Sequence, residues 1–83
     1  MVQIARSPRQ MGNIIQRTRK QRSLTQTDLA NLAGLRQELI SKIETGHEGT
    51  KLSSVYALFA ALDLELVVDK RSGPTSKEIE DIF

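Results

Sequence analysis

The chain has 83 residues, a formal net charge of +2 and no cysteine. This length suits one small domain, and the lack of cysteine excludes disulfide bonds and thiolate metal sites. With one histidine as well, we expect no bound metal and no other cofactor. No stretch approaches the roughly 20 apolar residues of a membrane span, and residues 1–10 hold no apolar signal-peptide core. We therefore expect a cytoplasmic protein without membrane contact.

Charge is distributed unevenly along the chain. Residues 1–49 hold eight basic and four acidic side chains, whereas residues 50–83 hold four basic and six acidic ones. A basic half suits a polyanion such as nucleic acid. Two solvated surfaces of opposite sign would give the same counts, so charge alone leaves both interpretations open.

The first expected helix covers residues 8–22. Ser7 and Gln10 match a Ser-x-x-Gln capping box, and Pro8 suits the first helical position. Apolar residues then follow at helical spacing. The basic residues of the last turns complement the helix dipole, so a purely structural role also accounts for them.

The second expected helix covers residues 25–33. Thr25 begins it, and Asp28 is its capping-box partner. The periodicity predicts a buried stripe made of Leu29, Leu32 and Ala33. Gly34 follows at the position where a left-handed helix cap is typical.

A third expected helix covers residues 36–44, with Ile40 and Ile43 on its inner face. Two helices joined by a tight turn that contains glycine make the helix-turn-helix arrangement, whose second helix can enter the major groove of DNA. Its outer face is polar and comprises Arg36, Gln37, Glu38, Ser41 and Lys42. Leu39 also points outward, where it would either contact a thymine methyl group or pack sideways.

After a fourth expected helix at residues 52–62, the hydrophobic period changes. In "LELVVD", Leu64, Leu66 and Val68 alternate with Glu65 and Val67, which predicts a strand at residues 64–69. A single strand cannot pair its own backbone groups, and the sequence offers no second strong strand. The expected partner is the same strand of a second copy. The residues of this dimer strand are Leu64, Leu66, Val67 and Val68.

Residues 70–83 are expected to form a flexible tail after a domain at residues 1–69. The tail begins with the turn-rich "KRSGPTS" and ends in the acidic, amphipathic "SKEIEDIF". Such segments order on binding a partner's pocket, although a frayed terminus is the alternative. The predicted partner-binding anchors are Ile79, Ile82 and Phe83.

The predicted fold class is all-α: a helix-turn-helix domain of four to five helices, with one C-terminal β-strand paired across a homodimer. The segments "LTQTDLANLAGL" and "ISKIETG" resemble the helix-turn-helix of Cro/C1-type repressors, and this resemblance covers about residues 8–62. Ser7-Pro8 and the strand "LELVVD" after the fourth helix resemble the HipB-type antitoxins.

This resemblance implies a homodimer that binds operator DNA and a HipA-type toxin kinase. It places Gln26 at a phosphate and the outer face of the third helix near the major groove. It also implies an ion pair between Arg19 and Glu44, although a DNA-facing Arg19 is the alternative. At Arg36 the sequence departs from the family, which commonly has a capping Ser or Thr there.

Side-chain chemistry assigns individual contacts to this helix. Gln37 can bind adenine bidentately, Arg36 or Lys42 can bind guanine, and Glu38 can accept from cytosine. The phosphate contacts are expected at Thr25, Gln26 and Ser41. The alternative for each residue is a solvated position.

The predicted function is that of a homodimeric antitoxin. It would bind an inverted-repeat operator in double-stranded DNA, repress its own toxin–antitoxin operon and neutralise a HipA-like kinase. The alternatives are a stand-alone phage-type or restriction-modification regulator, and an adaptor that has lost DNA binding. We expect no enzyme, because His47 has no Cys or Ser partner at a telling spacing.

Overall fold

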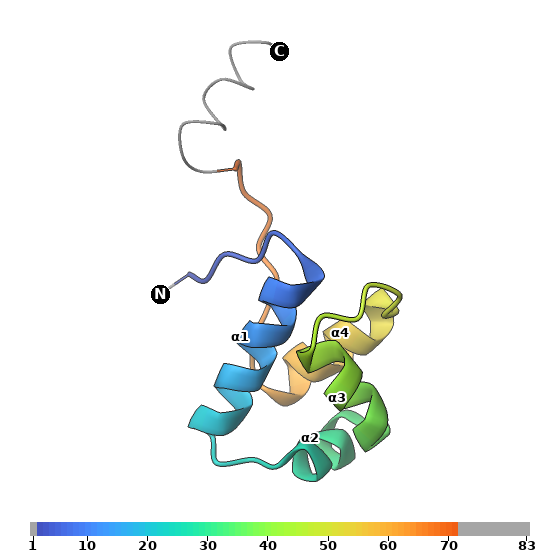
Figure 1. The fold of residues 1–83 in the computed structure, drawn as a ribbon. Coiled ribbons are helices and arrows are strands. Elements are labelled where there is room, and N and C mark those ends of the chain that lie inside the picture. Colours follow the sequence, from blue (N-terminus) through green and yellow to red (C-terminus); the bar gives the residue numbers. More distant parts are fainter. Residues whose placement is uncertain (1, 72–83) are drawn as a thin grey trace.

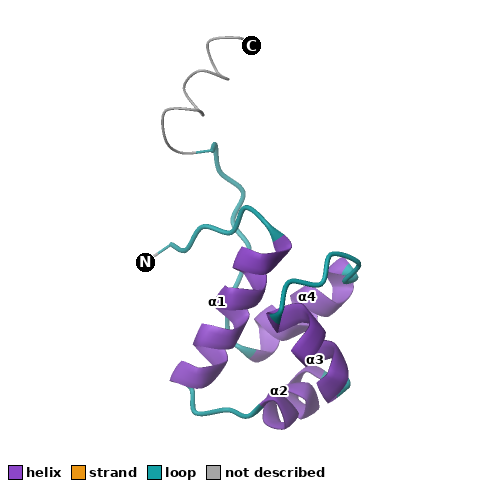
Figure 2. Ribbon diagram, in the orientation of Figure 1, coloured by secondary structure: helices purple, strands orange, loops and turns teal. Residues whose placement is uncertain are grey.

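Four helices make up the fold (Figure 1) of the computed structural model, which describes residues 2–71. They are α1 (Pro8–Gln21), α2 (Gln26–Ala33), α3 (Gln37–Glu44) and α4 (Leu52–Ala61). The described part contains helices and loops but no strand (Figure 2). The all-α fold class is confirmed. The predicted anchors Ile79, Ile82 and Phe83 lie outside the described residues.

Capping residues begin the first two helices. The Ser7 hydroxyl accepts from the Gln10 backbone N–H at 3.1 Å. The Gln10 side chain accepts from the N–H of Arg6 rather than from that of Ser7, so only one half of the expected box forms. At α2 both halves form: Asp28 N–H donates to the Thr25 hydroxyl at 3.0 Å, and Thr25 N–H donates to Asp28 Oδ2 at 2.9 Å.

The turn between α2 and α3 depends on Gly34. Its φ of 70° and ψ of 33° lie in the left-handed region, and its N–H donates to Ala30 O, as the sequence predicts. This cap ends α2 and redirects the chain, so that α3 packs against both α1 and α2.

The predicted burial of Leu32 is wrong, because its side chain is 62% exposed. Leu29 and Ala30 are buried, and Ala33 is half-buried. At 100° per residue, the direction midway between Leu29 and Ala30 lies roughly 110° from Leu32. Position 32 therefore falls outside the inner face of this short helix.

One apolar core joins all four helices. Its fully buried side chains come from α1, α2, α3, α4 and the residue after α4: Ile15, Leu29, Ile40, Leu58 and Leu62. Leu39 is half-buried and packs against this core. Of the two predicted roles for Leu39, the structure therefore shows sideways packing.

A glycine allows α1 and α3 to approach closely. A Cβ atom at Gly12 would lie 2.3 Å from the backbone oxygen of Ile43 and 2.8 Å from that of Glu44. Both distances are far below van der Waals contact. Only glycine fits between these helices, and the contact fixes the end of α3 against α1.

Residues 64–69 leave the core in an extended path without forming a strand in the single chain. Leu64 N–H donates to Phe59 O at 2.7 Å, and its side chain packs on the core. Leu66, Val67 and Val68 are 40%, 69% and 98% exposed. A ladder requires a second strand, and none lies in the described part of this chain. Pairing across a dimer therefore stays a prediction.

Candidate nucleic-acid interface

The outer face of α3 presents a row of polar side chains. Arg36, Glu38 and Lys42 are exposed, while Gln37 and Ser41 are half-buried. The inner face is held by Ile40 and Ile43, which are 0% and 3% exposed. Packing thus determines which side of the helix is free to meet a partner.

A buried ion pair ties the end of α3 to α1. Arg19 Nε donates to Glu44 Oε2 at 2.7 Å, and a second guanidinium nitrogen donates to Oε1 at 3.1 Å. The third donates to Leu24 O at 2.8 Å. The Arg19 and Glu44 side chains are only 10% and 1% exposed, so the ion pair implied by the resemblance is present and lies inside the fold.

Two glutamines extend this ion pair to the start of α3. Gln26 Nε2 donates to Glu44 Oε1 at 3.1 Å, and Gln37 Nε2 donates to Gln26 Oε1 at 2.6 Å. The resulting chain of hydrogen bonds runs from α1 to the end of α3, then to the first residue of α2, and from there to the first residue of α3. It orients both glutamines before any ligand is present.

The hydrogen bonds leave Gln37 with the groups needed to read a base. A glutamine amide has two N–H donors and one carbonyl acceptor, and the bond to Gln26 uses one donor. One N–H and the oxygen remain, which are the two groups that pair with adenine N7 and N6. The geometry is therefore compatible with base contact by Gln37 while Gln26 holds it.

The start of α3 has no side-chain cap. Arg36 occupies the N-cap position and makes no capping hydrogen bond, as expected of a side chain without an acceptor. Glu38 lies in the first turn, where its charge complements the helix dipole. Glu38 therefore has a structural role available that needs no contact with cytosine.

Thr25 and Asp28 keep the start of α2 in place. Hydrogen bonds from the Thr25 backbone and side chain lower the pKa of Asp28 below its usual value of 3.8. The Thr25 hydroxyl also accepts from Asp28 N–H, so the side chain takes part in both directions within this cap.

The sequence did not reveal the link between Gln26, Gln37 and Glu44. The three residues are up to 18 positions apart, and no local spacing brings them together. Gly12 was also missed. Its position one turn inside a helix, where glycine is unfavourable, was the one available signal of a close helix contact.

The described residues meet the requirements of neither a metal site nor a membrane span. Residues 2–71 contain no group of three or more His, Asp or Glu side chains placed to hold a metal ion. None of the helices among them is long and apolar enough to cross a membrane. His47 lies exposed in the loop between α3 and α4.

Comparison with known proteins assigns this arrangement to a family. The Helix-turn-helix family matches residues 15–68. Antitoxin HipB of Escherichia coli O6:H1 (strain CFT073) is 30% identical over 78 residues, covering 92% of this chain and 83% of the relative. The chain belongs to the HipB-type branch of the helix-turn-helix family. Antitoxin HipB of Escherichia coli K12 is also 30% identical, with 89% of its length covered.

Solved structures agree with this HipB-type assignment. A HipB–O4 20mer complex superposes with a TM-score of 0.80 at 28% identity, covering 86% of this chain and all of that one. A HipA–HipB–O2–O3 complex gives 0.79 at 28% identity, with the same coverage. The restriction-modification controller protein C.AhdI from Aeromonas hydrophila gives 0.65 at 29% identity, covering 70% of this chain and 88% of that one.

Proposed function

We propose that the protein is a homodimeric antitoxin that binds inverted-repeat operator DNA, represses its own toxin–antitoxin operon and neutralises a HipA-like kinase. DNA binding is supported by the family and by the polar face of α3. Toxin binding is supported by the relatives, which are antitoxins, and by a structure of one in complex with HipA.

The hydrogen-bonded pair of Gln26 and Gln37 is the observation that supports this function most. It lies where the starts of α2 and α3 meet, with its 2.6 Å bond anchored through Glu44 to the buried Arg19. A network inside a protein holds its members in one geometry. We propose that Gln37 reads a base while Gln26 donates to the adjacent phosphate with its second N–H.

The neighbouring side chains complete the proposed interface. Arg36 and Lys42 are exposed cations that would contact guanine or release counterions from phosphates. Thr25 and Ser41 are the further phosphate donors, and Glu38 is the proposed cytosine partner. Because phosphate contacts carry no sequence information, only the base contacts would discriminate between operators.

The dimer is proposed to form through residues 64–69. Leu66, Val67 and Val68 are exposed in the single chain, and an antiparallel pair of these segments would satisfy the facing edges of both backbones and bring their side chains together. A two-fold axis there would place the recognition helices about one DNA turn apart, ~34 Å. Replacing Val67 with proline removes a ladder donor and should weaken the dimer.

Toxin capture is assigned to the tail at residues 70–83, through its acidic last segment "SKEIEDIF" with the anchors Ile79, Ile82 and Phe83. This assignment rests on the sequence alone. Deleting residues 76–83 should leave dimerisation and operator binding unchanged but weaken capture of a HipA-like kinase in calorimetry. Unchanged toxin affinity would move the contact to the helical body.

Gln37→Ala tests the DNA site, with Gln26→Ala as its matched partner. In anisotropy titrations, Gln37→Ala should lose roughly 1–3 kcal/mol for the specific site and relax base preference at one position in each half-site. Gln26→Ala should weaken specific and random duplexes through the lost phosphate contact, with a smaller additional loss on the specific site because Gln37 loses the acceptor that holds it. Equal losses on both duplexes for Gln37→Ala would contradict its assigned role.

A stand-alone regulator is the second candidate, because the restriction-modification controller shares the fold and 29% identity. Such a regulator needs dimerisation and DNA binding but no toxin. Co-expression with the kinase-like product of a neighbouring gene, followed by pull-down through this chain, separates the two. Recovery of a stable complex supports the antitoxin, and a lack of binding by a folded kinase supports the regulator.

A further inference from the structure

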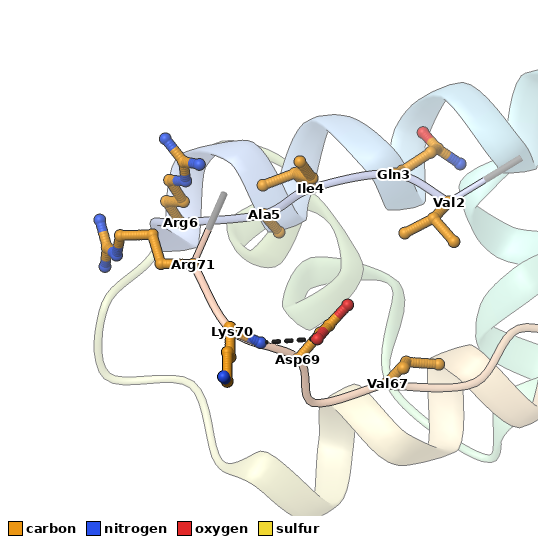
Figure 3. A pocket seen from close by; sticks show the side chains of 9 residues that line it. All are labelled: Val2, Gln3, Ile4, Ala5, Arg6, Val67, Asp69, Lys70 and Arg71. Carbon is orange, nitrogen blue, oxygen red and sulfur yellow. Dashed lines mark hydrogen bonds between the residues drawn. The ribbon is translucent and has the colours of Figure 1, made fainter. Parts of the chain in front are cut away.

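An open groove separates the two ends of the described chain. Its volume is about 510 Å³, and its lining comes from residues 2–6 before α1 and residues 67–71 after α4. Figure 3 shows Val2 and Ile4 on one side and Val67 on the other. Val2 and Ile4 are 79% and 58% exposed, so apolar side chains line a space that nothing in the described chain fills.

Most of the backbone along both walls of this groove is drawn out in Figure 3 without secondary structure. Neither residues 2–5 nor residues 65–69 make a backbone–backbone hydrogen bond to any other described residue. Extended backbone in this state is a template for an added strand.

The two walls run in the same sense. In Figure 3 the N-terminal arm, residues 2–6, and the segment 67–71 both lead toward the end marked by Arg6 and Arg71. A two-fold axis perpendicular to the segment 64–69, as in the antiparallel dimer proposed above, makes the partner's segment run opposite to that of the first copy. It would therefore also be antiparallel to the first copy's arm.

We propose that the N-terminal arm is an outer strand of the dimer sheet and that it pairs with the partner's residues 64–69. The partner strand lies in the groove, between the arm and the strand of the first copy. The sheet then has four strands in the order arm, partner strand, own strand, partner arm. Every neighbouring pair is antiparallel. This inference rests on the homodimer proposed above.

The dimensions of the groove fit one strand. A residue in a sheet occupies roughly 160 Å³, from about 4.8 Å between strands, 3.3 Å of rise and 10 Å of thickness. The groove of about 510 Å³ therefore has room for about three residues, the length of the exposed apolar run at residues 66–68.

Charge also favours a second copy as the occupant. In Figure 3, Arg6, Lys70 and Arg71 lie at one end of the groove, where these cations outnumber the one acid in the lining, Asp69. An antiparallel partner strand brings its first residues, including the acidic Glu65, to that end. Its apolar residues would then lie against Val2, Ile4 and Val67, which share the groove lining.

Disulfide trapping tests this order of strands, because the chain has no cysteine of its own. One preparation carries Ile4→Cys, and the other carries Leu66→Cys, Val67→Cys or Val68→Cys, so that the register need not be known. Because each copy in the mixture carries only one cysteine, a disulfide between arm and strand must join two different copies. Ser53→Cys, an exposed position on α4, replaces the strand cysteine in the control.

We expect mass spectrometry to find the arm-to-strand peptide for at least one strand position and not for Ser53→Cys. Ile4→Cys and Val67→Cys are also combined in one chain. The proposed order puts them roughly two strand spacings apart, beyond the 4.4–6.8 Å Cα separation of a disulfide. A disulfide within one chain, or no arm-to-strand disulfide at all in a protein that is dimeric, would overturn the inference.

Proline substitution gives an independent readout. An edge strand donates alternate N–H groups to its neighbour, so either Gln3→Pro or Ile4→Pro should raise the dimer Kd roughly two- to tenfold, and the other should change it little. Two unchanged values would refute a strand in the arm while the dimer stands. A monomeric wild type in sedimentation would instead refute the homodimer, and the arm pairing with it.

Discussion

Removing Arg19 should cost a large part of the protein's stability, because its partner carboxylate would be left buried. Arg19→Met deletes two hydrogen bonds to Glu44 and one to Leu24 O. The Glu44 side chain is 1% exposed and would keep only the neutral donor of Gln26. Breaking one side of a buried pair costs about 3–5 kcal/mol.

This loss is large for a chain of 83 residues, whose stability is on the order of 4–12 kcal/mol. The matched control is the double variant Arg19→Met/Glu44→Leu, which removes both charges. Apolar replacement of a complete buried pair is often neutral, so the double variant should lie within about 1 kcal/mol of wild type. The double variant also removes the anchor of Gln26, and its DNA affinity should fall although it folds.

Urea unfolding followed by circular dichroism at pH 7 measures these differences, with all variants at one protomer concentration because a dimer's stability depends on it. Two results would refute the reasoning. One is a loss below about 1 kcal/mol for Arg19→Met. The other is a double variant as unstable as the single one, which would mean that Glu44 tolerates burial alone.

Three further outcomes follow from the backbone and the caps. Gly12→Ala should lower the free energy of unfolding in urea by about 1–3 kcal/mol, although alanine has the better helix propensity, because a Cβ atom would lie 2.3 Å from Ile43 O. A stabilised variant would contradict the close helix contact. Gly34→Ala should lower the free energy of unfolding by about 1 kcal/mol through the φ of 70° alone, because nothing lies within 4 Å of an added Cβ. A change near zero would contradict the view that this turn needs glycine for its left-handed backbone. Because the pKa of Asp28 is lowered, its charge stabilises the fold above about pH 4, and this contribution is lost as the pH falls through the folded pKa. The unfolding midpoints of wild type and Asp28→Asn should therefore converge as the pH is lowered from 7 to 3. A gap that stays constant would exclude the charge of this cap as the cause.

Capping residues and apolar periodicity predicted the helices, because both depend on residues that are close in sequence. Contacts between residues far apart in sequence could not be predicted in this way. The α2 capping box and the left-handed Gly34 depend on neighbours within a few residues, so the sequence contained them. Leu32 was misplaced because an eight-residue helix has too few turns to define its inner face. The contacts among Gln26, Gln37 and Glu44 depend on how α2 and α3 cross, which periodicity does not specify.

The C-terminal segment, residues 64–69, shows that a strand prediction also depends on a partner that a single sequence does not reveal. Alternation at residues 64–69 predicts a strand, but a strand becomes stable only when a ladder forms. The exposed Val68 is consistent with a segment whose partner is another chain. The N-terminal arm was not singled out from the sequence, since residues 2–6 are too few to show a period. Only the fold brings them to the same groove as residues 67–71.

Selection of bound DNA from a randomised duplex pool tests the central claim most directly. The wild-type protein should enrich an inverted repeat whose half-sites are centred about 10 base pairs apart. Gln37→Ala should enrich the same repeat with one position in each half-site no longer specified. Enrichment of no sequence, or of a single unrepeated motif unaffected by Gln37→Ala, would contradict a dimeric helix-turn-helix protein that reads its operator through α3.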